Sequence, residues 1–436
     1  MNKYILSKYN HYVDTENKKL IYNSLSNKFA VLSNEQIKSI SLMQCNSDVI
    51  ERLQVDGFVN KEDMDEDVLA YAKFDSEINN SGLNFTILAS ENCNFNCVYC
   101  FEKFRGNNIE DKVVEDIIHY LRVNLRKYTS LNIHWFGGEP LLAKDKIFRM
   151  SESFIDISYQ LKREYTASIT TNGYLLDLQT FKTLLHNKVL TYIITIDGLP
   201  EIHDKNRPHR DGGQTFDHII NNLKQIRDNI KSNIFQIIIR TNVTMSSITS
   251  FKKYINFIDN EFGQDKRFSF LISPVYDWGG EKIQEIREKL VYDLSDFYAI
   301  LLNSNIHLNF DVLSSQLRNR LCAYSRKNTY TITANGRILL CPQLNKTVFG
   351  SIDNGVLNLN HYRLAKWYSL SSEKAVRCRN CSEYNICKGK TCISNLLALD
   401  NNIISEDLPE CGREYKELSN ILKLLYKSNK ELFIEY

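Results

Sequence analysis

The sequence has no run that approaches 18 consecutive apolar residues, so no membrane-spanning helix is predicted. Its first residues, MNKYILSKYNHY, interleave polar and apolar side chains and lack the apolar core of a signal peptide. A net charge of +2 over 436 residues gives no basic surplus that would favour a nucleic acid or a membrane surface as partner. We therefore expect a cytoplasmic, globular protein of two or three domains, with no nucleic acid and no membrane partner.

Cysteine is absent from the long stretch between Cys100 and Cys322, although the chain has 11 cysteines. Three lie at 93–100, seven lie between 322 and 411, and Cys45 stands alone. Disulfides are rare in a reducing cytosol, so cysteines gathered in this way indicate metal ligands.

The first group has the spacing C-x3-C-x2-C and consists of Cys93, Cys97 and Cys100, directly after an apolar run. Three thiolates can bind three irons of a [4Fe–4S] cluster and leave the fourth iron open for another ligand. A zinc ion would normally take a fourth Cys or His from nearby, and this loop offers none. The loop therefore favours an iron–sulfur cluster over zinc.

Residues 1–82 form the first predicted domain, in which strand-like stretches precede two helical ones. Ser33 and Gln36 have the spacing of a capping box at a helix start. This order is typical of a winged-helix-like domain. The acidic segment NKEDMDE at 60–66 argues against DNA and for a peptide partner.

Residues 83–303 alternate strand and helix six times, which predicts an α/β fold with parallel strands and right-handed crossovers. Six such units fit a partial (β/α)6 TIM-like barrel, whose functional groups gather where strands end. The expected strands are 83–89, 131–136, 165–171, 189–196, 235–243 and 267–273.

Unusual residues lie at or just after the end of each expected strand. After the cysteine loop come Gly137-Gly138-Glu139-Pro140, then Thr171-Asn172, Thr195 and Asp197, an Arg-Thr-Asn segment at 240–242, and Tyr276-Asp277. Tyr276 and Asp277 are the candidate acid–base residues, although residues at such positions often only cap the end of an element or pair with another side chain. Residues 304–436 form the third predicted domain, with short strands around cysteine pairs and a closing helix at about 413–428.

The C-x3-C-x2-C loop, the aromatic Tyr99 before its last cysteine and the GGEP segment resemble the radical S-adenosylmethionine (SAM) enzymes. The seven later cysteines resemble the SPASM extension of that superfamily, with one departure: four residues, not three, separate Cys387 from Cys392. The N-terminal unit looks like the leader-recognition domain of peptide-modifying members.

The resemblance implies that the open iron binds the amino and carboxylate groups of SAM, and that reductive cleavage gives a 5′-deoxyadenosyl radical. The GGEP glycines would approach the amino group and Glu139 would pair with it, while Thr195 and Asp197 would bond ribose hydroxyls or the carboxylate. Tyr99 would border the adenine. Arg207 would reach the carboxylate, or else lie in a solvated loop. The implied cofactor-binding residues are Tyr99, Gly137, Gly138, Glu139, Pro140, Thr171, Asn172, Thr195, Asp197 and Arg207.

By the same resemblance, Cys378, Cys381, Cys387 and Cys411 would bind one auxiliary [4Fe–4S] cluster. Cys322, Cys341 and Cys392 would bind a second, leaving one position for an exchangeable ligand such as a substrate thiolate. A zinc ribbon is the alternative for the paired cysteines.

These features predict a radical SAM maturase that forms a thioether in a short ribosomally made precursor peptide, with a flavodoxin or ferredoxin as reductant. Residues 1–82 would grip the leader of that peptide. Carbon–carbon cross-linking and formylglycine formation, as in anaerobic sulfatase-maturing enzymes, are alternatives within the enzyme class. A zinc-stabilised winged-helix regulator is the alternative outside it.

Overall fold

The computed structural model describes residues 4–16, 18–42, 46–102, 106–277, 282–291, 293–318, 321–343, 347–377, 381–387 and 416–436. The predicted ligands Cys378, Cys392 and Cys411 lie outside these residues, as do Cys45 and the side chain of Cys387. Within the described part of the chain, no helix is long and apolar enough to cross a membrane.

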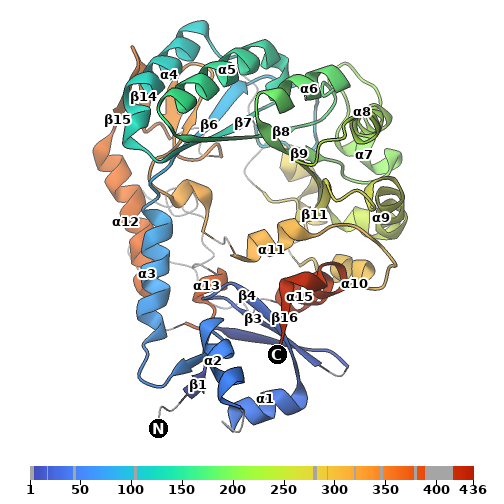
Figure 1. Cartoon of the computed structure of the whole chain (residues 1–436). Helices are drawn as coiled ribbons and strands as arrows, with labels where there is room; N and C mark the ends of the chain where they lie inside the picture. Colours follow the sequence, from blue (N-terminus) through green and yellow to red (C-terminus); the bar gives the residue numbers. More distant parts are fainter. Residues whose placement is uncertain are drawn as a thin grey trace.

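Six parallel strands in sequential order form the centre of the molecule, which confirms the α/β partial-barrel prediction. The helices between them pack on the outside of the curved sheet (Figure 1). The strands are β6 (Leu83–Ser90), β7 (Ser130–Gly137), β8 (Glu164–Thr171), β9 (Val189–Thr195), β10 (Gln236–Val243) and β11 (Phe268–Pro274). The helices are α4 (Asp111–Asn124), α5 (Lys144–Gln160), α6 (Leu178–His186), α7 (Pro200–Asn206), α8 (Phe216–Asn229) and α9 (Ile248–Phe262).

Burial explains why these segments form strands and helices. All but one residue of β6 are buried and β10 is rich in isoleucine, as expected for parallel strands covered on both faces. The amphipathic α4 places Val113, Ile117 and Leu121 in the core, at the spacing of one helix face.

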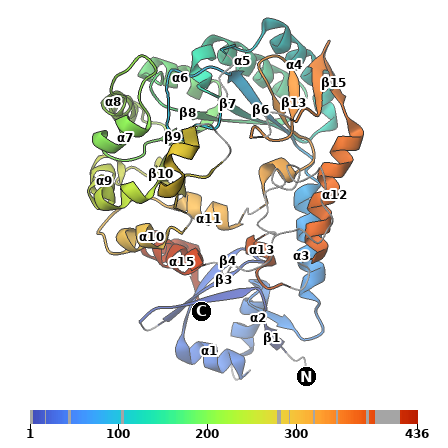
Figure 2. The same cartoon turned by 180° about the vertical axis from the view of Figure 1, so that it is seen from behind.

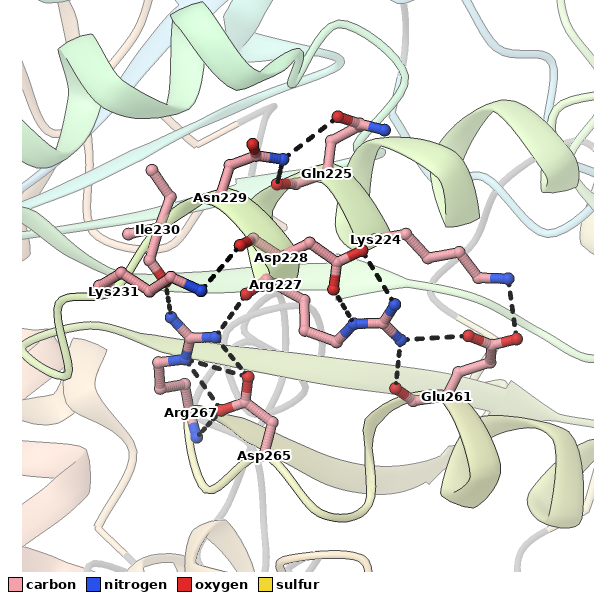
Figure 3. A network of polar contacts seen from close by, with 10 residues as sticks. All are labelled: Lys224, Gln225, Arg227, Asp228, Asn229, Ile230, Lys231, Glu261, Asp265 and Arg267. Carbon is pink, nitrogen blue, oxygen red and sulfur yellow. Dashed lines mark hydrogen bonds and ion pairs between the residues drawn. The ribbon is translucent and has the colours of Figure 1, made fainter.

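A polar network fastens the amino end of β11 to the ends of α8 and α9 (Figure 3). The Arg267 guanidinium donates to the Asp265 carboxylate and, at 2.8 Å, to the carbonyl of Arg227. Arg227 in turn donates to the carbonyl of Glu261 at 2.7 Å. The network holds one end of the barrel together and leaves the carboxyl ends of the strands to the loops.

The sheet continues beyond β6 through residues that follow the barrel. β12 (Thr329–Ile332) pairs in parallel with β6, and three antiparallel strands follow it in order. They are β13 (Arg337–Leu339), β14 (Gly350–Asp353) and β15 (Val356–Leu359), with α12 (His361–Arg377) after them. This continuation places the segments of Cys322 and Cys341 beside the strand that leads into the first cysteine loop.

The N-terminal unit contains an antiparallel sheet of β2 (Asn10–Asp14), β3 (Lys18–Asn23) and β4 (Lys28–Ser33). Beside it lie α1 (Asn34–Ser41), α2 (Ser47–Val55) and the short pair of β1 (Tyr4–Leu6) with β5 (Val59–Lys61). Ser33 and Gln36 form the predicted capping box. The helix α3 (Glu66–Ile78) was not predicted, and its N-cap is Asp65 of the acidic segment.

Helices lie between the barrel and this unit (Figures 1 and 2). On one side α10 (Ser295–Leu302) packs against α15 (Lys416–Ser428), with α11 (Asp311–Arg318) close by. After α15 the chain returns to the N-terminal sheet, where β16 (Phe433–Glu435) pairs in parallel with β4. That sheet therefore contains strands from both ends of the sequence.

Candidate functional site

A cavity opens at the carboxyl ends of the barrel strands, where the sequence predicted the functional groups. The empty space within it, including a part that is open to solvent, is about 960 Å³. The predicted site residues that line it are Cys93, Cys97, Tyr99, Cys100, Gly137, Gly138, Thr171, Asn172, Thr195, Arg207 and Tyr276. Glu139, Pro140, Asp197 and Asp277 are not among the lining residues.

The three cysteines of the first loop meet at this cavity. Cys93 and Cys97 are buried, and the Cys93 sulfur accepts a hydrogen bond from the backbone N–H of Phe95 at 3.3 Å. Burial raises the pKa of Cys93 and of Cys100 to about 12, because isolated thiolates are costly there. Among the described residues, no three Cys, His, Asp or Glu side chains are grouped as they would be around a single metal ion.

The two glycines of GGEP are required by the backbone of the cysteine loop. Gly137 has a φ of +135°, and a Cβ there would lie 2.1 Å from the carbonyl oxygen of Ser90. A Cβ on Gly138 would lie 2.4 Å from the carbonyl oxygen of Asn92. The backbone N–H of Gly138 donates to Ser90 at 3.0 Å, and that of Glu139 donates to Asn92 at 2.8 Å. The glycines therefore let the second strand end lie directly against the cysteine loop.

The predicted pairing of Glu139 with the SAM amino group stays a prediction, and groups of the protein itself bind this carboxylate. Its carboxylate is fully buried and accepts hydrogen bonds from the Thr171 hydroxyl and the Asn172 N–H, both at 2.7 Å. It also accepts one from the N–H of Leu141 at 2.9 Å. Burial raises the pKa of Glu139, and these hydrogen bonds oppose the shift. Glu139 is thus a positioning residue that joins the second and third strand ends.

The bond of Asp197 to SAM also stays a prediction; its carboxylate accepts from Tyr99 and is not among the groups that line the cavity. The Tyr99 hydroxyl donates to Asp197 at 2.5 Å and accepts from Arg207 at 2.8 Å and from the Asn242 side chain at 3.1 Å. Burial raises the pKa of Tyr99 well above its ordinary value. Tyr99 lines the cavity, and its hydroxyl ties the cysteine loop to two strand ends and to Arg207.

The alternative of a solvated loop is wrong for Arg207, which is only 8% exposed. Burial lowers the pKa of its guanidinium, but the acidic groups of Cys97, Tyr99 and Asp197 outweigh this and raise it overall. Its buried Nε has no hydrogen-bond partner in the protein. A buried cation with an unused donor, beside three thiols, fits a group that brings anionic atoms into this cavity.

Arg240 and Asn242 also line the cavity; the sequence predicted an unusual segment here but no role for either residue. The Arg240 guanidinium donates to the Asn242 side chain and to the Ser273 hydroxyl, both at 3.1 Å. Burial lowers the pKa of Arg240. The available signal was the position of both polar residues late in an otherwise apolar strand.

The two candidate acid–base residues are separated by the structure. Tyr276 lines the cavity and is 41% exposed. The Asp277 carboxylate instead accepts a hydrogen bond from the Arg287 guanidinium at 2.7 Å. It therefore forms an ion pair within the protein, which is the structural role that the sequence analysis gave as the alternative. The prediction that Asp277 faces the cavity is therefore wrong.

Cys322 and Cys341 both lie near Tyr324, next to the barrel. Burial, and then the nearby Cys341 and Cys322, raise the pKa of Tyr324 to about 12. The Tyr324 hydroxyl is 3.3 Å from the hydroxyl of Thr86 on β6. Cys381 packs against a small core that contains Leu321, the residue before Cys322, together with Tyr9 and other residues of the N-terminal unit.

Comparisons with known proteins agree with this geometry. Residues 87–255 match the family model of the Radical SAM superfamily. The chain is 26% identical over 333 residues to the cysteine-type anaerobic sulfatase-maturating enzyme of Clostridium novyi (strain NT). The aligned region covers 69% of this chain and 85% of the relative.

Two solved structures share the fold. Native anSMEcpe with bound AdoMet and Kp18Cys peptide superposes with a TM-score of 0.55 at 20% identity, covering 80% of this chain and 98% of that chain. SuiB of Streptococcus suis bound to the precursor peptide SuiA superposes with a TM-score of 0.50 at 18% identity, covering 91% and 97%.

A zinc-stabilised winged-helix regulator is wrong as an account of this chain, since its central part is the matched domain. The family match, the parallel partial barrel and the cavity bordered by the C-x3-C-x2-C loop together show that the chain carries a radical SAM domain and is an enzyme.

Proposed function

We propose that this enzyme is a peptide maturase that joins a cysteine sulfur to a carbon atom of another residue in a ribosomally made precursor. A radical SAM domain binds a [4Fe–4S] cluster and SAM. Cys93, Cys97 and Cys100 would hold the cluster, and the cavity beside them would hold SAM. When bound, these groups supply one-electron chemistry that can remove a hydrogen atom from an unactivated carbon.

The chain's own residues position and shield that chemistry. Arg207, which is buried, and Arg240, which is partly buried, offer cations to anionic atoms in the cavity. The Glu139 and Tyr99 hydrogen bonds fix three strand ends against the cysteine loop. The apolar side chains of Phe95, Phe136 and Val275 line the same cavity and help to exclude water from it.

The observation that carries the thioether proposal is the placement of Cys322 and Cys341 beside β6, on the flank of the barrel that bears the first cysteine loop. We infer that these two, with Cys392, bind an auxiliary cluster with a position left for a substrate thiolate. Cys378, Cys381, Cys387 and Cys411 would bind the other. Thiolate is a soft ligand suited to such an iron site.

A peptide substrate is supported by both structural comparisons, in which the related enzymes carry bound peptides. We propose that residues 1–82 bind the leader of the precursor. This unit shares a core with the cysteine-rich segment through Tyr9, Phe74 and Tyr384, so a peptide held by it would lie near the auxiliary site. A flavodoxin or ferredoxin would supply the electron.

The test is anaerobic incubation with SAM, a reductant and the small peptide encoded beside this gene, followed by mass spectrometry. A thioether product has lost two hydrogens and no longer reacts with a thiol-alkylating reagent. A carbon–carbon cross-link loses two hydrogens but keeps a free thiol. Equal turnover of a peptide whose cysteines are replaced by serine would contradict the proposal.

Formylglycine formation is the second candidate, favoured by the sulfatase-maturating relative. That reaction oxidises a Cys or Ser side chain to an aldehyde and removes the sulfur of a cysteine. The same mass measurement separates the two, because a thioether retains the sulfur. A variant with Cys341→Ala adds a second readout: we expect it to keep SAM cleavage and lose cross-linking.

A further inference from the structure

The cavity contains a cation, Arg240, whose bonded partners are all neutral. Its Nε donates to the side-chain oxygen of Asn242 and its Nη2 donates to the hydroxyl of Ser273, both at 3.1 Å. In the part of the chain that the structure describes, no carboxylate forms an ion pair with this guanidinium. The guanidinium groups of Arg267 and Arg287, in contrast, each pair with an aspartate.

These neutral partners hold the Arg240 guanidinium in a fixed orientation. Asn242 is itself held, because its side chain donates to the Tyr99 hydroxyl at 3.1 Å. A guanidinium has five N–H groups, and the two contacts use the one on Nε and one of the two on Nη2. Both N–H groups of Nη1 and the second of Nη2 remain, and a carboxylate binds such an edge with two parallel hydrogen bonds.

The two arginines of the cavity occupy different parts of it. Arg207 lies on the side of the cysteine loop, with its guanidinium 5.7 Å from the ring centre of Phe95. Arg240 is on β10 and reaches β11 through Ser273. The cavity wall continues from there to Tyr276, which is 41% exposed, so solvent reaches the cavity on this side. Arg240 is therefore the cation nearer to the β11 side, from which a substrate can enter.

Asp197 lies near both arginines, but its carboxylate is already bound by other groups. It accepts from the Tyr99 hydroxyl at 2.5 Å and from the backbone N–H of Asn242 at 3.2 Å. Burial lowers the pKa of Arg240, and the opposing effects of Tyr99 and Asp197 do not outweigh it. The pKa of Arg207, in contrast, is raised overall despite its burial. The charge of Arg207 is thus balanced within the protein and that of Arg240 is not.

Glu102 is the other carboxylate at the cavity, and it lies on the opposite flank. It is close to Cys100 and to Tyr324, whose hydroxyl meets Thr86 of β6. SAM has a single carboxylate, which the resemblance assigns to Arg207. A second anion is therefore needed to balance Arg240 when the site is occupied, because a partly buried cation without a counter-ion is costly.

We propose that Arg240 is a specificity-determining residue that binds a carboxylate of the substrate. The peptide would present there either an Asp or Glu side chain or its own C-terminal carboxylate. A carboxylate fixed at Arg240 would hold the neighbouring carbon atoms of the substrate inside the cavity, where a hydrogen atom is to be removed. That the substrate is a peptide rests on the proposed function, whereas the anion site itself does not.

The test measures binding of the fluorescently labelled small peptide encoded beside this gene, by anisotropy, to the anaerobically reconstituted enzyme with SAM. Each Asp of the peptide is replaced by Asn and each Glu by Gln, one at a time, and a further peptide has an amidated C-terminus. The enzymes are the unaltered chain, Arg240→Gln and the control Arg122→Gln, whose site is exposed on α4. A lost ion-paired hydrogen bond corresponds to at least a tenfold loss of affinity.

We expect one of these peptide changes to weaken binding to the unaltered and control enzymes at least tenfold and to leave binding to Arg240→Gln unchanged. Which change does so identifies a side-chain or a C-terminal carboxylate. Arg240→Lys keeps the charge and should recover part of the preference for the acidic peptide, which a purely structural role would not do. If Arg240→Gln does not fold, Arg240→Lys is used in its place, with a smaller preference expected.

The proposal is overturned if Arg240→Gln weakens the acidic and neutral peptides equally, or if each peptide change acts equally on all the enzymes. It is also overturned if Arg240→Gln weakens SAM binding tenfold and leaves peptide binding unchanged, since Arg240 would then serve the cofactor. If the unaltered enzyme binds none of the peptides, the proposed function fails, and N-acetylaspartate amide is used as probe in saturation-transfer NMR. A signal that Arg240→Gln abolishes supports the anion site, and equal signals from both enzymes overturn it.

Discussion

Replacement of Tyr99 by phenylalanine tests whether its hydroxyl holds the cavity wall together. The ring and its packing remain, while three hydrogen bonds are lost, two of them to the charged groups of Asp197 and Arg207. A hydrogen bond to a charged group contributes about 1.5–3 kcal/mol, so the two sum to about 3–6 kcal/mol. Asp197 keeps its bond from the N–H of Asn242 at 3.2 Å, which favours the lower end, about 3 kcal/mol.

The assay is urea-induced unfolding of the anaerobically reconstituted protein, followed by far-UV circular dichroism, together with the rate of SAM cleavage. Tyr159→Phe is the matched control, since Tyr159 is 84% exposed and the change should stay within about 0.5 kcal/mol. We expect Tyr99→Phe to retain its iron, because its three cysteines are untouched, and to cleave SAM more slowly. A Tyr99→Phe protein as stable as the control, with unchanged cleavage, would refute the reasoning.

Three further predictions concern the glycines, a buried histidine and the polar network. Gly137→Ala should lower SAM cleavage at least 100-fold, because the added Cβ meets backbone, whereas Gly213→Ala, with a similar φ of +137° but nothing within 4 Å, should change it only a few-fold. Burial lowers the pKa of His134 from 6.5 to about 4, so the unfolded chain binds the proton first. The contribution of neutral His134 to the free energy of unfolding is therefore fully present above pH 6.5, and about 3 kcal/mol of it is lost as the pH falls toward 4. In urea unfolding, His134→Asn should remove that part of the pH dependence. Arg267→Lys should lower the melting temperature by several degrees through loss of its forked contacts, and an equal effect of the exposed Asp228→Asn would contradict this.

The barrel was predictable from the sequence because its signals are local. Each strand is an apolar run bounded by polar or glycine residues, and β7 alternates buried and partly buried positions along its whole length. The observed bounds agree with the predicted ones to within about two residues. The cysteine loop was equally visible, since its spacing lies within eight residues of sequence.

What the sequence could not give is which polar groups bond each other. Residue types at strand ends pointed to Glu139 and Asp197, but their partners are 32 to 98 residues away in sequence. Only the folded backbone brings these carboxylates to Thr171 and Tyr99. The pairing of β16 with β4 has no local signal at all, because the strands lie about 400 residues apart and pair over three residues.

The central claim is that Cys93, Cys97 and Cys100 hold the cluster that cleaves SAM. The direct measurement is 5′-deoxyadenosine formed anaerobically by a protein with all three cysteines replaced by alanine, with its iron content determined in parallel. We predict that 5′-deoxyadenosine falls to background while iron bound by the later cysteines is retained. Formation of 5′-deoxyadenosine at the rate of the unaltered protein would contradict the account.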